Sequence, residues 1–254
     1  MIETGRYLIG VAGASGFGSK STADEVTENC DLRSTTAIIT GATSGIGAET
    51  ARVLAKRGAR LVFPARNVKA AEEAKGRIVS EFPEAEIVVM ELDLSSISSV
   101  RSFVAGFESL HLPLNLLINN AGRLAHEHAI SEDGIEMTFA TNYLGHFLLT
   151  NLLLKKMIQT AEKTGVQGRI VNVTSDLVFF LTSKLLKTVP QAAATTCYVA
   201  TNPRLMNVSG KYFTDCNETT PSGLGSNSSE ASKLWAASEI LVTQHSKTGF
   251  DPLS

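Results

Sequence analysis

The strongest constraint on the fold is a glycine-rich turn, Thr40 to Gly47, which joins a short apolar segment to an amphipathic one. Residues 36–40 read Thr-Ala-Ile-Ile-Thr, a β-branched run that is typical of a buried strand. Residues 46–57 carry apolar side chains at helical spacing, and Gly58 follows as a helix terminator. A strand, a tight glycine turn and a helix in this order predict the first unit of an open α/β sheet.

The same alternation continues along the chain. Further strands are predicted at 61–63, 86–90, 114–118 and 168–173, and further helices at 68–81, 97–110 and 134–162. Strands that alternate with helices predict a parallel sheet covered by helices on both faces, and near-continuous apolar strands fit such a sheet. We therefore predict an α/β protein with a Rossmann-type, doubly wound parallel sheet in a single domain.

The regular alternation stops after the fifth predicted strand, and this divides the chain into three parts. Residues 1–33 are predicted to be a loose leader segment, and residues 34–175 to be the nucleotide-binding Rossmann core. Residues 176–254 are predicted to be a remnant of a C-terminal part, with a helix, a short strand, a helix and a polar tail. The fold is therefore expected to be truncated after its fifth strand.

Composition excludes several functional classes. The 254 residues carry a formal net charge of −2, which argues against binding to nucleic acid or to an anionic membrane. No stretch approaches the ~18 uninterrupted apolar residues of a transmembrane helix. The three cysteines, Cys30, Cys197 and Cys216, have no metal-binding or redox spacing. We therefore expect no metal site and a reducing compartment.

The glycine turn is predicted to bind the pyrophosphate of a nucleotide. Gly41, Gly45 and Gly47 allow the backbone to turn tightly and to approach the phosphates. The helix that begins near Ser44 and Ile46 presents unpaired N–H groups and the positive end of its dipole to the same place. Because the flanking strand and helix are both predicted, this turn is a much stronger signal than three glycines alone.

The residues at the end of the second predicted strand indicate which nicotinamide nucleotide is bound. An NAD site usually has an acidic residue about 20 positions after the glycines, where it binds the ribose 2′-hydroxyl. This chain has Ala65-Arg66-Asn67 there, without an acid. A guanidinium suits a 2′-phosphate in charge and in donor geometry, so Arg66 predicts NADP(H) rather than NAD(H). The alternative is that Arg66 is a solvated loop residue.

A second glycine cluster, Gly13 to Gly18, imitates the nucleotide-binding fingerprint. Residues 19–29 after it are mostly polar, and no strand follows them. We therefore interpret this cluster as part of a flexible leader that packs on the domain, and not as a nucleotide site.

Further motifs make residues 34–175 resemble the short-chain dehydrogenase/reductase family. They are Asp93-Leu94, Asn119 to Gly122, Thr141 to Phe147, and the strand from Arg169 to Ser175. Within that family, the chain is most similar to retinol-dehydrogenase-like members and to plant Tic-type members associated with the chloroplast translocon.

The resemblance implies roles for individual residues. Asp93 and Leu94 would border the adenine pocket, and the segment Asn120, Ala121 and Gly122 would contact the cofactor. The family's active-site asparagine and catalytic serine match two further residues, Asn142 and Ser175. In the family, the serine holds the substrate oxygen and the asparagine supports a water that reaches a catalytic lysine.

The family's Tyr-x-x-x-Lys pair is missing from the sequence. Its tyrosine exchanges the substrate proton, and its lysine lowers the pKa of that tyrosine. None of the four tyrosines has lysine four residues later; they are Tyr7, Tyr143, Tyr198 and Tyr212. The chain passes from Ser175 to Asp176 as if ~60–80 residues, on the order of two βα units, were absent.

Substitutes for the pair and a repaired sheet are both conceivable. Tyr198, or one of Lys184 and Lys187, could approach the nicotinamide, although these lysines are better interpreted as helix-surface charges. In a repaired topology, the short strand at 211–214 would pair directly beside the fifth strand through a right-handed crossover.

The resemblance therefore implies an NADP(H)-dependent oxidoreductase for a small lipophilic carbonyl or alcohol, catalytically impaired by the absent tyrosine and lysine. One alternative is a non-catalytic protein that binds NADP(H) or a partner, such as a second copy or a full-length relative. Another is a truncated splice or gene-model product. The Tic-type resemblance implies the periphery of the chloroplast envelope, whereas the cytoplasm stays open because the leader is a poor transit peptide.

Overall fold

The computed structural model describes residues 7–124, 128–174, 187–223 and 225–244. Its residues group into two compact units that interleave along the chain. The first unit comprises Met1–Glu91, Leu112–Ala121 and Lys156–Thr219, and the second comprises Leu92–His111, Gly122–Lys155 and Thr220–Ser254. The chain thus enters each unit more than once, so neither unit is a continuous segment.

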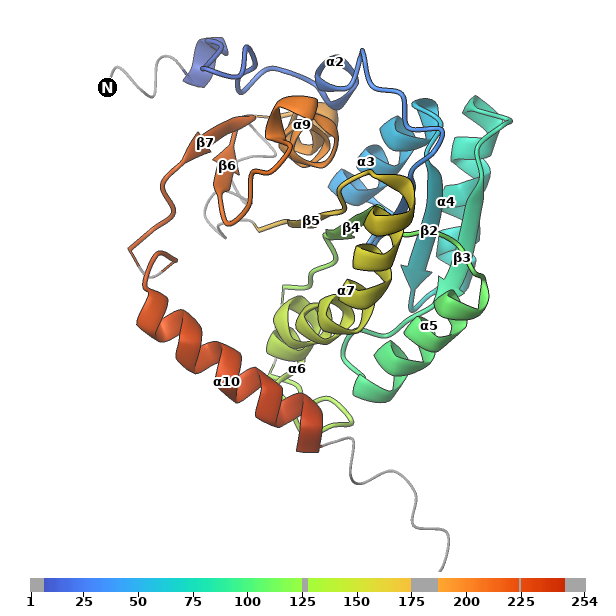
Figure 1. Cartoon of the computed structure of the whole chain (residues 1–254), viewed down its shortest axis with the longest axis vertical. Coiled ribbons are helices and arrows are strands. Elements are labelled where there is room, and N and C mark those ends of the chain that lie inside the picture. The colour runs from blue at the N-terminus through green and yellow to red at the C-terminus, as the bar shows by residue number, and fades with distance from the viewer. Residues whose placement is uncertain (1–6, 125–127, 175–186, 224, 245–254) are drawn as a thin grey trace, which may run out of the picture. The chain divides into compact units, whose positions relative to one another are not determined.

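The first unit contains a five-stranded parallel sheet in the order β3-β2-β1-β4-β5. Strands β2, β3, β4 and β5 of this sheet are labelled in Figure 1. The strands are β1 (Thr36–Ile39), β2 (Arg60–Ala65), β3 (Ile87–Glu91), β4 (Leu116–Asn119) and β5 (Arg169–Asn172). The order reverses at β1, whose neighbours are β2 and β4. In an open α/β sheet, ligands bind at the carboxyl ends of the strands beside such a switch point. The predicted Rossmann-type sheet is confirmed.

The core of the first unit lies around this sheet. All four residues of β1 are buried, as expected for a central parallel strand. Phe63 and Ile118 are fully buried beside it, together with Leu54 from α3 (Gly45–Lys56). Helix α4 (Val68–Glu81) has the predicted bounds and contributes Ala74 and Ile78 to the same cluster. These contacts hold the turn between β1 and α3 on a rigid support.

The leader is not loose where the structure describes it, so that prediction is wrong. Helix α2 (Ala23–Val26) packs against α3 and against α9 (Val189–Thr201). Ala23 and Val26 are buried in a cluster with Cys197 and Tyr198 of α9. The expected packing of the leader on the domain is present, but two apolar side chains in a polar segment gave too weak a pattern to reveal an ordered helix, whose partner α9 is distant in the sequence.

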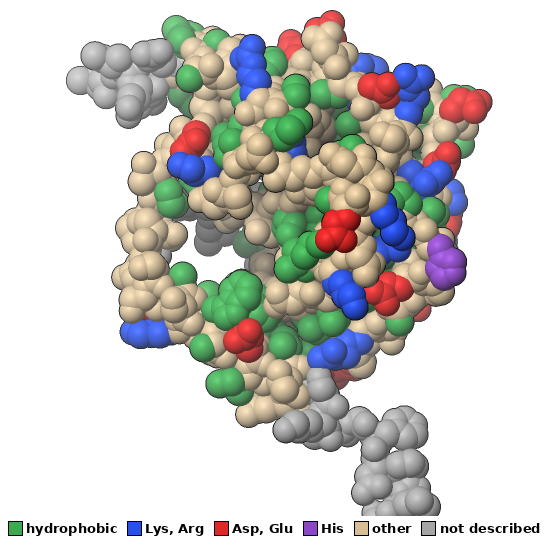
Figure 2. Space-filling view, viewed as in Figure 1, with side chains coloured by type: hydrophobic (Ala, Val, Ile, Leu, Met, Phe, Trp, Pro, Cys, Tyr) green, Lys and Arg blue, Asp and Glu red, His purple; other side chains and the backbone are tan. Residues whose placement is uncertain are grey.

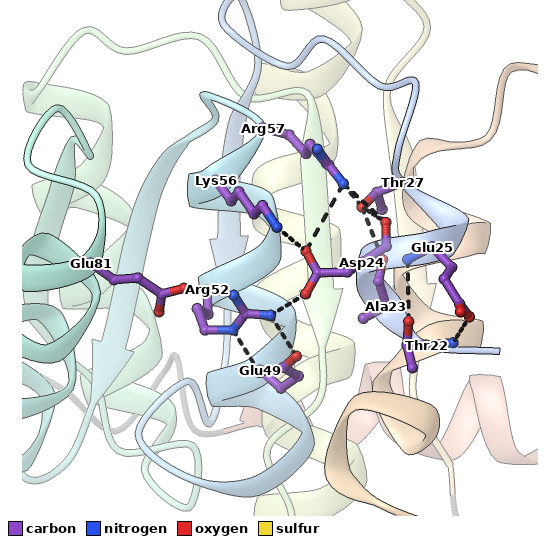
Figure 3. A network of polar contacts seen from close by, with 10 residues as sticks. All are labelled: Thr22, Ala23, Asp24, Glu25, Thr27, Glu49, Arg52, Lys56, Arg57 and Glu81. Atoms are coloured by element: carbon purple, nitrogen blue, oxygen red, sulfur yellow. Dashed lines mark hydrogen bonds and ion pairs between the residues drawn. The ribbon is translucent and has the colours of Figure 1, made fainter. Parts of the chain in front are cut away.

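A network of charged side chains also holds the leader on α3 (Figure 3). Asp24 accepts hydrogen bonds from Arg52 at 2.5 Å and from Lys56 at 2.6 Å. Arg57 donates to the carbonyl oxygen of Asp24 at 3.0 Å. Burial by itself would raise the pKa of Asp24, but the hydrogen bonds from Lys56 and Arg52 lower its pKa overall. The leader is therefore fixed by charge as well as by apolar contact.

The predicted repair of the sheet is wrong. Strand β6 (Tyr212–Thr214) pairs with β7 (Asn217–Thr219) as a separate antiparallel hairpin, and not with β5. The connecting residues Asp215 and Cys216 both have positive φ, at 50° and 64°, as in a two-residue type I′ turn. A hairpin closed by two residues costs much less loop entropy than a long crossover. Strand β6 therefore pairs with β7, its neighbour in the sequence.

Pro190 lies in the first turn of α9, where its missing N–H costs nothing. One more helical prediction needs correction. The predicted continuous helix at 134–162 is instead three pieces in the structure, α6 (Met137–Phe139), a π-helical turn η1 (Ala140–Leu144) and α7 (Gly145–Thr164). Short runs of π-helix leave no mark in hydrophobic periodicity, and they occur often at functional sites.

The second unit contains α5 (Ile97–Ser109), η1, the start of α7, and α10 (Ser228–Gln244). Helix α10 contacts the residues around η1 through a few side chains. Ser238 Oγ lies 3.1 Å from the hydroxyl of Tyr143, and the rings of Trp235 and Phe147 meet edge to face at 5.0 Å. Most of α10 is otherwise exposed.

The surface has mixed charge. On the face drawn in Figure 2, basic and acidic side chains are interspersed, in keeping with the net charge of −2. Among the helices that can be described, none is both long and apolar enough to cross a bilayer. Over those same residues, no three His, Cys, Asp or Glu side chains are grouped as ligands for a metal.

Candidate functional site

The glycine turn has a backbone that side chains would not allow. Gly41 has φ +70° and Gly45 has φ +56°, both in the left-handed region that favours glycine. A Cβ on Gly47 would lie 2.2 Å from the carbonyl oxygen of Gly41. A Cβ on Gly45 would meet nothing within 4 Å, so the space beside this residue is open. The turn therefore presents bare backbone next to free space, as a nucleotide pyrophosphate requires.

Thr40 and Asn120 tie the turn to the end of β4. The Thr40 hydroxyl accepts hydrogen bonds from the backbone N–H groups of Asn120 and Ala121, both at 2.9 Å. Asn120 Nδ2 donates in return to the carbonyl oxygen of Thr40 at 2.9 Å. A Cβ on Gly41 would lie 2.9 Å from Cα of Ala121. The structure thus brings together two predicted parts of the site, the glycine turn and the segment after β4.

Ser44 and Ile46 have different surroundings at the start of α3. Ser44 is exposed and occupies the N-cap position, where its side chain makes no capping hydrogen bond. The first N–H groups of a helix have no intrahelical partner, so they face outward together with this hydroxyl. Ile46 instead packs its side chain against the cluster shared by the leader and α9. Only the backbone of Ile46 is left to contact a ligand.

Arg66 follows β2 directly and is exposed. The next residue, Asn67, caps α4 by accepting a hydrogen bond from the N–H of Ala70 at 3.0 Å. Within the described part of the chain, no carboxylate lies within ion-pair distance of Arg66. Its guanidinium is therefore available to an anion outside the protein.

Asp93 and Leu94 lie in the second unit, just before α5. Asp93 Oδ1 accepts hydrogen bonds from the N–H of Ser95 at 2.8 Å and from its hydroxyl at 2.6 Å. The backbone of Leu94 is in close contact with the start of α7, because a Cβ on Gly145 would lie 2.1 Å from its carbonyl oxygen. Gly145 thus has a packing reason to be glycine, and it holds the Asp93-Leu94 turn in place.

Asn142 lies in the π-helical turn and holds the loop after Gly122. Its Oδ1 accepts from the N–H of Arg123 at 2.8 Å, and its Nδ2 donates to the carbonyl oxygen of Arg123 at 2.9 Å. The backbone carbonyl of Asn142 lies 3.2 Å from His146 Nδ1. Burial lowers the pKa of His146, which favours a neutral ring that donates to this carbonyl. Gly122 and Asn142 are neighbours, as the predicted site requires.

The predicted site residues therefore fall into two groups. The first unit holds Gly41, Ser44, Gly45, Ile46, Gly47, Arg66, Asn120 and Ala121, and the second holds Asp93, Leu94, Gly122 and Asn142. Ser175, the predicted catalytic serine, lies outside the described residues, as does Lys184.

Lys187 is not the surface charge that the sequence suggested. Its side chain is 8% exposed and forms an ion pair with Asp215 in the turn of the β6–β7 hairpin. Its ammonium also lies 5.6 Å from the ring centroid of Tyr7. Tyr198 is buried, with its ring 5.8 Å from Phe17 and 6.4 Å from Phe213. Both candidate substitutes for the catalytic pair therefore have structural contacts of their own.

The second glycine cluster contacts a protein side chain. Asn217 Oδ1 accepts from the N–H of Ser15 at 3.0 Å, and Asn217 Nδ2 donates to the carbonyl oxygen of Phe17 at 3.0 Å. A Cβ on Gly13 would lie 2.3 Å from Asn217 Oδ1. These glycines allow a close approach of β7, and no helix like α3 follows them.

Sequence reasoning missed the roles of Thr40 and His146. The sequence identifies Thr40 only as the first residue of the glycine turn, yet its hydroxyl accepts hydrogen bonds from the N–H groups of both Asn120 and Ala121. The available signal was a hydroxyl directly after the apolar residues 37–39 of a buried strand, where it needs a hydrogen-bond partner. His146 lies four residues after Asn142, and this helical spacing within the predicted helix 134–162 was the available signal for their contact.

Comparison with known proteins connects this geometry to a family. A family model described as short chain dehydrogenase matches residues 35–182. Short-chain dehydrogenase TIC 32 B, chloroplastic, from Brassica napus is 42% identical, over 92% of this chain and 97% of that protein. Retinol dehydrogenase 12 from Bos taurus is 32% identical, over 79% of this chain and 84% of that protein. Both resemblances inferred from the motifs are confirmed.

Solved structures agree. A putative uncharacterized protein from Mycobacterium paratuberculosis has a TM-score of 0.60 at 27% identity, over 88% of this chain and 98% of that chain. A metagenomic short-chain oxidoreductase in complex with NADP has a TM-score of 0.50 at 26% identity, over 66% of this chain and 72% of that chain.

The alignment with the Brassica napus protein also reveals a length difference. It has 310 positions, but 92% of this 254-residue chain is about 234 residues, so about 76 positions have no counterpart here. This difference agrees in size with the ~60–80 residues, or about two βα units, predicted to be absent.

Proposed function

Because the chain belongs to the short-chain dehydrogenase/reductase family, we propose that it binds NADP(H) at its glycine turn and has little or no hydride-transfer activity left. The ancestral substrate would be a small lipophilic carbonyl or alcohol. The observation that carries this proposal is the close packing of Gly47 against the Gly41 carbonyl and Asn120 Nδ2, which leaves no room for a Cβ on Gly47. This contact keeps the first turn of α3 bare for a pyrophosphate.

The preference for NADP(H) over NAD(H) rests on Arg66. It is an exposed guanidinium at the end of β2, where an acidic residue would select the 2′-hydroxyl instead. The similar metagenomic oxidoreductase was solved with NADP, which supports the same choice. The residues that would hold the cofactor are Gly41, Ser44, Gly45, Ile46, Gly47, Arg66, Asp93, Leu94, Asn120, Ala121 and Gly122.

The impairment follows from the chemistry of carbonyl reduction. Bound NADPH supplies a hydride to the carbonyl carbon, and the protein must deliver a proton to the oxygen as the second half of the reaction. No tyrosine in the chain has a lysine four residues later. Lys187 is paired with Asp215, and Tyr198 is buried among aromatic rings, so neither is available to donate that proton. Ser175 and Asn142 would be the remaining active-site residues, and the site would lack a general acid.

We place the absent segment between Ser175 and Asp176. The fifth strand of the family leads to its serine, and here the following residues already resemble a late helix of the family. The difference of about 76 alignment positions supports a loss of this size. A transcript that restores an in-frame segment at this point would show that the shorter chain is a splice or gene-model product.

A second candidate function is partner binding without catalysis. Helix α10 exposes large apolar side chains, with Leu234, Trp235 and Ile240 between 41% and 56% exposed. Exposed apolar groups of this kind often mark an interaction site. A second copy of this chain or a full-length relative would be the partner, and cofactor binding without turnover would favour this role.

The decisive experiment is a fluorescence titration of the purified protein with NADPH and, in parallel, with NADH. We expect saturable binding that favours NADPH by about 10-fold or more, which corresponds to about 1.4 kcal/mol. The Arg66→Gln variant should have a smaller preference for NADPH while it keeps its affinity for NADH. A folded protein that binds neither nucleotide would overturn the proposal.

Activity is tested separately. Oxidation of NADPH is followed at its absorbance band with a panel of lipophilic aldehydes and ketones, with a full-length relative as the positive control. We expect no turnover above the rate without protein. Turnover that Ser175→Ala abolishes would contradict the impairment and leave cofactor binding unaffected.

A further inference from the structure

Arg77 reaches the glycine turn from the far end of α4. Its Nη2 donates a hydrogen bond to the carbonyl oxygen of Thr43 at 3.2 Å, and Thr43 is part of the turn. The residue is exposed and lies in the last two turns of the helix. Arg66 precedes the first turn of the same helix, so α4 brings a guanidinium to the turn that is separate in sequence from Arg66.

Arg77 differs from neighbouring arginines in its charge balance. Three arginines on α3, after α3 or on β2 are near carboxylates: Arg52 with Asp24, Glu49 and Glu81; Arg57 with Asp24; Arg60 with Glu86. No carboxylate of the described chain lies within ion-pair distance of Arg77 or Arg66. Because partnered guanidiniums are already neutralised, Arg66 and Arg77 are the two that can attract an anion to this side of the turn.

A surface cavity joins Arg77 to the start of α3. Its volume is about 350 Å³, and both Gly45 and Arg77 line it. It also contains the carboxylates of Glu49 and Glu81, but Arg52 donates to both, at 2.9 Å and 3.0 Å. A group that extends from the turn therefore meets open space with Arg77 at its edge.

We propose that Arg77 is a second specificity-determining residue for the 2′-phosphate of NADP(H), in addition to Arg66. This inference rests on the proposed NADP(H) binding. A guanidinium has five N–H donors, and the Thr43 carbonyl occupies one side of it. The remaining donors are free to bind phosphate oxygens while the Thr43 contact holds the group beside the turn. Thr43 thus orients Arg77, and Arg77 adds positive charge where the 2′-phosphate distinguishes the two nucleotides.

A purely structural role for Arg77 predicts a different pattern of binding. If Arg77 only fixed the turn, its loss would weaken NADPH and NADH equally, because both share the pyrophosphate. If it contacts the 2′-phosphate, only NADPH and other 2′-phosphorylated ligands are weakened. The ratio of the two affinities separates these roles without any measurement of catalysis.

The test compares Arg77→Gln with the wild-type protein by fluorescence titration with NADPH and NADH, and by calorimetric titration with 2′,5′-ADP and 5′-ADP. We expect the dissociation constants for NADPH and 2′,5′-ADP to rise about 10-fold, with little change for NADH and 5′-ADP. Arg77→Lys, which keeps the charge, should fall between the two. Arg60→Gln removes the same charge from the opposite end of β2 and should leave all four constants unchanged.

Three outcomes would overturn the inference. Equal weakening of both nucleotides would assign Arg77 a positioning role, and an unchanged NADPH constant would assign it none. Circular dichroism and the thermal midpoint of Arg77→Gln must match the wild type, as expected for an exposed helical residue. If the wild type shows no preference for NADPH, the proposed function itself fails, and this inference fails with it.

Discussion

The chain contains two glycine clusters, Gly13 to Gly18 and Gly41 to Gly47, which are similar in composition but make different kinds of contact. Gly41 and Gly47 pack closely against neighbouring groups, and Gly45 leaves bare backbone facing open space at the start of a twelve-residue helix. Gly13 and its neighbours instead admit the side chain of Asn217 from β7. Glycine provides a close approach in both places. Which group comes close depends on the structure around each cluster. The first cluster leads into a helix N-terminus, whereas the second lies against a distant strand.

The largest difference between the two clusters should appear when one glycine in each is replaced by alanine. In Gly47→Ala the new Cβ would clash with the Gly41 carbonyl, so we expect a loss of about 3 kcal/mol in the free energy of unfolding. NADPH binding should also be lost. Gly16→Ala is the matched control, because Gly16 has φ +87° but no neighbour within 4 Å. Its cost should be about 1–2 kcal/mol, with NADPH affinity intact.

Urea unfolding and NADPH titration of both variants measure this contrast. Equal losses of affinity would mean that the two clusters are not functionally distinct.

Asn217→Ala removes the partner of the second cluster. Its two hydrogen bonds to Ser15 and Phe17 are partly buried, so we expect a loss of about 2 kcal/mol. The leader should then be cleaved faster in limited proteolysis, whereas the dissociation constant of NADPH should not change. Thr219→Ala, at an exposed position of the same strand, should have little effect on either measurement. A large loss of NADPH affinity in Asn217→Ala would show that the second cluster supports the cofactor site.

Asp24→Asn tests the charges that hold the leader. Asp24 is partly buried and has two cationic partners within 2.6 Å, so we expect a loss of about 1–2 kcal/mol at pH 7. Because the folded-state pKa of Asp24 is lowered, this stability is present above the unfolded pKa and disappears as pH falls through the folded pKa. The unfolding curves of wild type and variant should therefore converge in acid.

Asp31→Asn is the control for this charge effect. The Asp31–Arg33 pair has side chains that are 61% and 82% exposed, so its removal should not be measurable at pH 7. A pH-independent difference between Asp24→Asn and the wild type would mean that shape, and not charge, holds the leader.

The smallest effect is expected for a glycine with no role in a turn. Gly76 lies inside α4 with ordinary helical φ and no neighbour within 4 Å of a built Cβ. Gly76→Ala should therefore raise the free energy of unfolding by about 0.5–1 kcal/mol, through the higher helix propensity of alanine. Thermal unfolding measures this directly. A destabilised Gly76→Ala would contradict the view that only the turn glycines are needed for close approach.

Much of the candidate site could be predicted because its parts are local. The strand, turn and helix around Gly41 to Gly47 follow one another in the sequence, and each has its own signal. The contact between Gly47 and Asn120 could not be predicted from residue types, since it requires β4 to lie beside β1. The π-helical turn at Asn142 left no trace in the periodicity, because hydrophobic residues continue on both sides of it.

The sequence by itself determined the parallel sheet, the order of its first strands and helices, and the glycine turn that a nucleotide would occupy. These features depend on residues within one βα unit, where backbone preference and apolar spacing act together. Only the tertiary structure decided the docked leader, the separate β6–β7 hairpin and the buried pair of Lys187 with Asp215. Those outcomes depend on partners far apart in the sequence, whose contact free energy exists only once the chain has folded.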